Sequence, residues 1–107
     1  MSEAAHYIIV REGMSPGVTT AQAVHAAGES SPGRSLLAPH TRVIVLTAKS
    51  SAELDATYAN LQTAGFLPHL FHEDDPPYNG APTALGVYVE DRTAIRELLR
   101  HLPLYRG

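Results

Sequence analysis

Residues 15–28 read SPGVTTAQAVHAAG and follow closely on an apolar run, HYIIV at residues 6–10. A short continuous apolar run of this kind is typical of a central strand that is covered on both faces of a sheet. The Pro-Gly pair after Ser15 predicts a turn, and the Ser15 hydroxyl can cap the free amides of a helix that starts there. The stretch therefore predicts a strand, a turn and a helix, with Gly28 suited to ending the helix.

The predicted helix has two different faces. Because residues three or four apart share a helical face, one stripe consists of Val18, Gln22, His25 and Glu29. We expect the small residues of the opposite side to press against the sheet, namely Ala21, Val24, Ala27 and Gly28. The polar stripe would then stand at the carboxyl end of the first strand, where open α/β sheets usually bind their ligands.

Outward from this junction, strand and helix patterns alternate along the chain. Apolar strand patterns occupy residues 41–47, 66–72 and 83–89. A capping box at Ser50 and Glu53 opens a second helix, and a leucine-rich stripe predicts a third helix that Pro103 ends. Residues 29–39 and 73–82 are rich in proline and read as loops. The order strand, helix, strand, helix, strand, strand, helix predicts a three-layer α/β domain with parallel first strands.

Composition limits the classes of protein that the chain can represent. With 107 residues, it is long enough for one core, so we expect a single domain over residues 1–107. The net charge of −3 and a single lysine, Lys49, argue against extended binding of a phosphate backbone, although a local patch could bind a nucleic-acid end. The absence of cysteine excludes thiolate catalysis. No stretch resembles a signal peptide or a membrane span, so we expect a cytoplasmic protein.

The first candidate site lies on the predicted helix. A neutral His25 imidazole can act as a general base, and the Gln22 amide can hold a water or a carbonyl beside it. Ser15, Thr19 and Thr20 stand at the helix entrance, where an anion or a developing oxyanion would be stabilised. The alternative is structural, with His25 packed against the long loop and Gln22 capping a polar edge.

An acidic trio follows the third predicted strand. One carboxylate of Glu73, Asp74 and Asp75 could orient and charge-stabilise His25. The Thr83 hydroxyl, at the start of the fourth predicted strand, would be available beside that loop. The alternatives are a solvated acidic turn and a threonine chosen for its β propensity.

Two further patterns concern cations and metals. The last predicted helix carries a ladder of arginines spaced by four residues, Arg92, Arg96 and Arg100. This ladder is a candidate for phosphate contact, and a solvated charged face is the alternative. His69 and His72 would point to opposite faces of a strand, so we expect no metal site. No phosphate-binding glycine motif follows a strand, which leaves nucleotide-fold cofactors unsupported.

Together these residues resemble the type 2 peptidyl-tRNA hydrolase family, including its shorter, divergent bacterial branch. The resemblance depends on VRE after the first strand, SPG, AQAVHA at residues 21–26, RVIVLTA, LFHEDD, TALGV and the terminal LPL. It implies a small mixed four-stranded sheet flanked by helices, often in a homodimer. It also implies hydrolysis, without a cofactor, of the ester that joins a peptide to the terminal ribose of tRNA.

The resemblance also assigns roles to individual residues. It places the family's helix-motif residues on Gln22 and His25, its loop acid on Asp75 or Asp74, and its following threonine on Thr83. Val18 stands where well-characterised members have a lysine, and an apolar side chain cannot neutralise a phosphate or an oxyanion. The chain would then hydrolyse peptidyl-tRNA with help from another cation, act on a smaller ester or amide, or keep the fold as an inactive homodimeric or partner-binding module.

Overall fold

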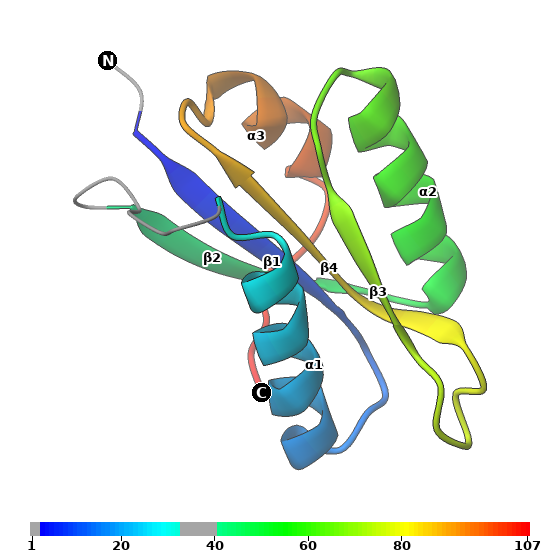
Figure 1. Ribbon diagram of the computed structural model, residues 1–107. Helices are drawn as coiled ribbons and strands as arrows, with labels where there is room; N and C mark the ends of the chain where they lie inside the picture. The colour runs from blue at the N-terminus through cyan, green and yellow to red at the C-terminus, as the bar shows by residue number, and fades with distance from the viewer. Residues whose placement is uncertain (1–2, 33–40) are drawn as a thin grey trace.

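Four strands form one mixed sheet, and helices cover both of its faces (Figure 1). The computed structural model describes residues 3–32 and 41–107. The elements are β1 (Ala5–Arg11), α1 (Pro16–Glu29), β2 (Arg42–Ala48), α2 (Ser51–Thr63), β3 (His69–Glu73), β4 (Ala81–Val89) and α3 (Thr93–Leu99). This order confirms the predicted α/β class and the predicted sequence of strands and helices. Residues 33–39 of the expected first loop lie outside the described residues.

The strand order in the sheet is β2-β1-β4-β3. β1 runs parallel to β2 and antiparallel to β4, while β3 and β4 form an antiparallel hairpin. β1 is thus a central strand, which explains why its apolar run is continuous: six of its seven residues are buried. None of the helices in the described parts of the chain is long and apolar enough to cross a bilayer.

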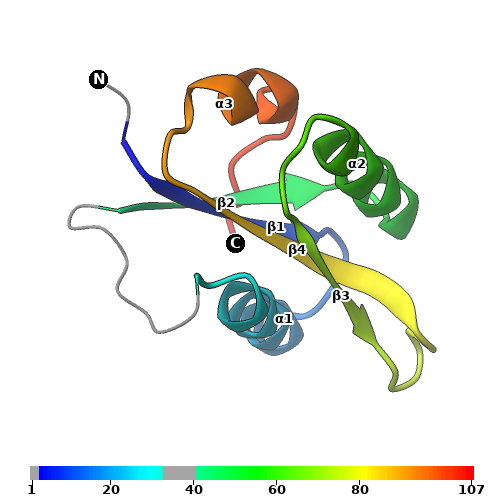
Figure 2. The same ribbon diagram turned by 45° about the horizontal axis from the view of Figure 1, so that its top comes forward.

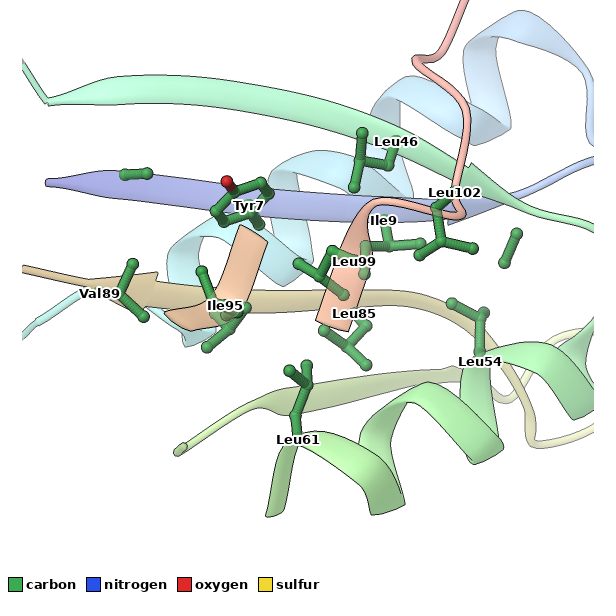
Figure 3. Packing of buried hydrophobic residues seen from close by; sticks show 13 residues of the cluster. Tyr7, Ile9, Leu46, Leu54, Leu61, Leu85, Val89, Ile95, Leu99 and Leu102 are labelled. Atoms are coloured by element: carbon green, nitrogen blue, oxygen red, sulfur yellow. The ribbon is translucent and has the colours of Figure 1, made fainter. Parts of the chain in front are cut away.

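The helices divide the molecule into three layers. α1 lies alone on one face of the sheet, and α2 and α3 lie together on the other (Figures 1 and 2). The larger core fills the space between the sheet and the α2–α3 layer (Figure 3), and its members include Ile9, Leu54, Leu61, Leu85 and Ile95. A smaller cluster lies under α1, made of Ile8, Val10, Ala26 and Ala84. Any site on the α1 side is therefore separated from α3 by the sheet.

The second helix and the third strand begin where local chemistry requires. The Ser50 hydroxyl accepts a hydrogen bond from the Glu53 amide at 3.1 Å, which confirms the predicted cap at the start of α2. α2 ends before Gly65, whose φ of 93° lies in the left-handed region. β3 begins at His69 rather than at residue 66, because Pro68 has no amide hydrogen for the ladder. β3 is an edge strand, as this proline favours.

The side of α1 that faces the sheet differs from the prediction. The buried residues of α1 are Thr19, Gln22 and Ala26, whereas Val24 is 66% exposed. The expected inward face of small residues at positions 21, 24 and 28 is therefore wrong. Gln22 can take an inward position because both ends of its amide find hydrogen-bond partners across the interface, which removes the penalty for burying it.

Gly86 permits the close approach of α1 to β4. A Cβ at this position would lie 2.5 Å from the Ala26 carbonyl oxygen and would also overlap the Ser30 hydroxyl. Gly86→Ala is expected to lower the free energy of unfolding by about 1–3 kcal/mol, because the helix must move away from the strand. Urea unfolding measures this change. Gly28→Ala is the control, since its Cβ would meet nothing within 4 Å; equal losses in both variants would contradict the packing argument.

Candidate active site

Gln22 connects α1 to the two strands of the β3–β4 hairpin. Its Nε2 donates to Glu73 Oε1 at 2.8 Å, and its Oε1 accepts from Thr83 Oγ1 at 2.9 Å. The amide orientation follows from chemistry, because an ionised carboxylate can only accept and so must face the NH₂ group. Gln22 is 3% exposed and Thr83 is fully buried. The buried Thr83 hydroxyl therefore fixes the Gln22 amide, and the Gln22 amide in turn holds the Glu73 carboxylate.

The pairing of β3 with β4 is irregular next to Thr83, whose side chain faces Gln22 of α1. Phe71 pairs with Ala84 and the next residue, His72, pairs with Pro82, so the register passes over Thr83. Such a bulge re-aims a side chain. Phe71 and Glu73 are two residues apart on β3 and both contact residues of α1, as expected for one face of a strand.

The Glu73 carboxylate is held in its ionised form. The Asp75 backbone amide donates to its Oε2 at 3.1 Å, and this hydrogen bond is the main cause that lowers the pKa of Glu73 below its ordinary value. The hydrogen bond from Gln22 lowers this pKa further, and the positive charge that His25 can carry acts in the same direction. Glu73 is therefore an ionised carboxylate at neutral pH, and its oxygens can accept hydrogen bonds from a ligand or a water.

The carboxylate opens into a cavity of about 330 Å³ between α1 and the β3–β4 turn. The cavity is lined by Gly17, Val18, Ala21, Gln22, Glu73, Asp75, Pro76 and Tyr78. Its size suits part of a ligand rather than a whole macromolecule. Of the residues predicted for catalysis, Gln22 and Asp75 line the cavity. Thr83 does not line it but donates a hydrogen bond to Gln22.

His25 lies beside this cavity and does not line it. Its ring stacks on Phe71 with the ring centroids 4.6 Å apart and the planes 4° from parallel. The side chain is exposed, so the imidazole is accessible to a substrate that covers the helix. Phe71 and Glu73 share one face of β3 and contact His25 and Gln22 of the same helix, so the imidazole and the carboxylate lie on the same side of the sheet.

The acid that contacts the helix differs from the two that the resemblance favoured. Glu73, not Asp74 or Asp75, bonds to Gln22; Asp75 contributes its backbone amide and Asp74 is exposed. The sequence carried a signal for this choice, because Glu73 follows Phe71 by two residues and so shares its face. Tyr78, which lines the cavity, was missed, since an aromatic in a turn has no periodic partner to reveal it.

The hydroxyl residues at the helix entrance serve the helix itself. Ser15 caps α1 by accepting from the Val18 amide at 3.4 Å. Thr19 and Thr20 donate their hydroxyls to the carbonyls of Ser15 and Pro16, each at 2.9 Å. None of the three lines the cavity, so their predicted contact with substrate stays a prediction.

The predicted phosphate-binding arginines lie in the opposite layer. Arg92 and Arg96 border a hollow of about 230 Å³ beside α3, on the other side of the sheet from Gln22. Arg92 also lies 3.6 Å from Glu3 Oε1. The chain after β4 carries α3 to the sheet face away from α1 (Figure 2), so these arginines lie apart from Gln22, and their predicted contact with phosphate stays a prediction.

The two strand histidines do not share a ligand position. His69 Nε2 lies 2.8 Å from Glu29 Oε1 at the end of α1. Within residues 3–32 and 41–107, no three histidine or acidic side chains are grouped as metal ligands.

Acidification is expected to destabilise the fold in two stages. Burial lowers the pKa of His6 below its ordinary value of 6.5, and that of Glu73 is held below 4.5. For both groups the unfolded chain binds the proton more readily, so the stability they contribute is present above the ordinary value and is lost as the pH falls through the lowered one. Urea midpoints should fall below about pH 6.5 and again below about pH 4.5. His6→Gln should remove the first stage; an unchanged first stage in this variant would contradict its assignment.

Fold and site together define a three-layer α/β domain with a carboxylate-bearing cavity between α1 and the turn of its β3–β4 hairpin. Neither a protein-family model nor a curated protein matches the chain. Among solved structures, it is similar to a protein of unknown function from Agrobacterium tumefaciens strain C58. The TM-score is 0.70 with 9% sequence identity, over 99% of this chain and 100% of that chain. At this identity the likeness concerns the fold alone.

Proposed function

We propose that this protein is a cofactor-independent hydrolase of the acyl ester of peptidyl-tRNA. The observation that carries the proposal is the ionised Glu73 carboxylate, held by the buried Gln22 amide and open to a cavity of about 330 Å³. A fixed carboxylate in a cavity is suited to orienting a water and accepting its proton. The resemblance of the AQAVHA helix to type 2 peptidyl-tRNA hydrolases supplies the substrate class.

In the proposed reaction, a water bound at Glu73 attacks the carbonyl carbon of the ester. Glu73 takes one proton from the water as the new C–O bond forms, and the carbonyl becomes a tetrahedral oxyanion. The bond to the ribose oxygen then breaks, and Glu73 returns the proton to that oxygen. The products are a peptide carboxylic acid, which ionises by releasing its proton to solvent, and a free ribose hydroxyl. His25, at the edge of the site, acts as the second base or as a cation that stabilises the oxyanion.

The direct test uses N-acetyl-aminoacyl-tRNA as substrate. The parent protein is expected to release the acyl group, and His25→Ala is expected to slow the release by about 10–100-fold. Lys49→Ala is the matched control, because Lys49 precedes α2 and its contact with that helix is made by its backbone amide, which donates to Glu53 Oε1 and is kept in alanine. Equal rates for the parent, the His25 variant and a blank would refute the proposal. Small esters and amides without tRNA, in the same panel, test the alternative of a hydrolase for small substrates.

A second candidate function is a non-catalytic module with the same fold. Val18 favours it, because this apolar side chain lines the cavity where family members have a lysine. If the parent is inert, Val18→Lys is expected to produce hydrolysis by adding a cation beside the carboxylate. Val24→Lys on the exposed side of α1 is the control. Strong turnover by the parent would exclude the module, and hydrolysis gained equally by both lysine variants would contradict the role of position 18.

The remaining expectations concern partners and location. The tRNA 3′ end as ligand, the homodimer implied by the resemblance and the cytoplasmic location belong to this proposal. Sedimentation of the purified protein tests the homodimer: a mass near 23 kDa, twice the chain mass of 11.5 kDa, supports it, and a mass of 11.5 kDa at all concentrations contradicts it.

A further inference from the structure

Arg11, the last residue of β1, is a fixed cation next to the candidate site. Its guanidinium carbon lies 5.0 Å from the centre of the Tyr78 ring, and its Nη1 donates to Ser51 Oγ at 3.2 Å. The Ser51 hydroxyl in turn donates to the Pro82 carbonyl at 2.6 Å. Among the described residues, Arg11 has no carboxylate in ion-pair contact. Its charge is therefore positioned by neutral groups and is not neutralised by them.

Arg11 also borders a second cavity, at the carboxyl ends of the parallel strands β1 and β2. This cavity measures about 410 Å³ and its lining includes Arg11, Glu12, Thr19, Thr47 and Arg106. Tyr78 lines the first cavity, the one that contains Glu73. The Arg11–Tyr78 pair thus connects the two cavities, since Arg11 lines the second and Tyr78 lines the first.

We propose that Arg11 binds the phosphodiester next to the terminal ribose of the substrate while the ester lies at Glu73. This inference rests on the proposed function and names the specificity-determining residue of the same site. A guanidinium stacked on an aromatic face keeps its N–H groups available in its own plane. With Nη1 donating to Ser51, the edge formed by Nε and Nη2 is the one that can make two parallel hydrogen bonds to phosphate oxygens. Arg11 would provide the positive charge that Val18 lacks.

The experiment compares two substrates that differ by this phosphate. One is the N-acetyl-phenylalanyl ester of the dinucleotide CpA, and the other is the same ester of adenosine. Arg11→Gln is expected to raise KM for the CpA ester about tenfold with little change in kcat, and to leave the adenosine ester unaffected. Arg11→Lys, which keeps the charge without the planar fork, should recover part of the loss. Arg42→Gln is the control, because this exposed arginine lies at the amino end of β2 and lines neither cavity.

A binding measurement separates this inference from the proposed hydrolysis. Deacylated CpA is titrated into the parent and into Arg11→Gln, and the dissociation constants are measured by NMR. CpA binding that weakens about tenfold in Arg11→Gln supports phosphodiester binding by Arg11. It does so even if neither ester is hydrolysed, and in that case the hydrolase proposal alone fails. An equal rise in KM for both esters, or a dissociation constant for CpA that is the same in the parent and in Arg11→Gln, would overturn the inference that Arg11 binds the phosphodiester. If Arg11→Gln does not fold, Arg11→Lys is tested instead. Phosphodiester binding by Arg11 then requires that KM rises for the CpA ester and not for the adenosine ester.

Discussion

Glu73→Gln is expected to reduce kcat for peptidyl-tRNA hydrolysis by about 10²–10⁴-fold, the range typical for the loss of a general acid or base. The substitution keeps the length of the side chain and removes its charge and its ability to accept a proton from water. The amide also presents a donor group where the Asp75 N–H now donates, so the side chain loses part of its fixed position. Single-turnover hydrolysis of N-acetyl-aminoacyl-tRNA measures the chemical step directly.

The neighbouring acids make this prediction specific. Asp74→Asn and Asp75→Asn remove the same charge from the same turn, so a general electrostatic effect would be similar in all three variants. We expect the largest loss at position 73, because this carboxylate alone among the three bonds to Gln22. Glu97→Gln on α3 serves as the remote control. A larger loss at Asp74 or Asp75 would show that the resemblance located the acid better than the hydrogen-bond network does.

Most of the fold could be predicted because its signals are local. The apolar run at residues 6–10, the capping box at Ser50 and the proline at 68 each depend on a few neighbouring residues. Their consequences are a central strand, the start of α2 and the edge position of β3. The pairing of β3 and β4 is less local, since a short connection fixes the proximity of two strands but not their exact register.

The site was predicted less completely because its geometry depends on distant contacts. Helical spacing grouped Gln22 with His25, but it could not show which side of α1 faces the sheet. That orientation follows from Gly86, which admits the helix backbone, and from Thr83, which satisfies the amide of Gln22. Neither residue is near α1 in the sequence. The choice of Glu73 among the acids likewise depends on its contact with Gln22 of α1, and its only local sign is the spacing of two residues from Phe71.

The Gln22–Thr83 hydrogen bond contributes to the stability of the fold and holds a residue of the proposed active site. Removing either its donor or its acceptor is expected to destabilise the protein. Gln22→Leu leaves the buried Thr83 hydroxyl without its acceptor, and Thr83→Val leaves the Gln22 carbonyl without its donor. Each change is expected to lower the free energy of unfolding by about 1–3 kcal/mol, the penalty for an unsatisfied buried polar group. Urea unfolding of both single variants and of the double variant measures these losses.

The double variant separates structural support from chemistry. With both partners apolar, no polar group of the pair remains unsatisfied, so the combined loss of stability should be smaller than the sum of the single losses. Hydrolysis should not recover, because the Glu73 carboxylate still lacks the amide that holds it. We expect Gln22→Leu and the double variant to lose at least tenfold in kcat to a similar extent. Additive stabilities would contradict the coupling, and full activity in the double variant would show that Glu73 acts without Gln22.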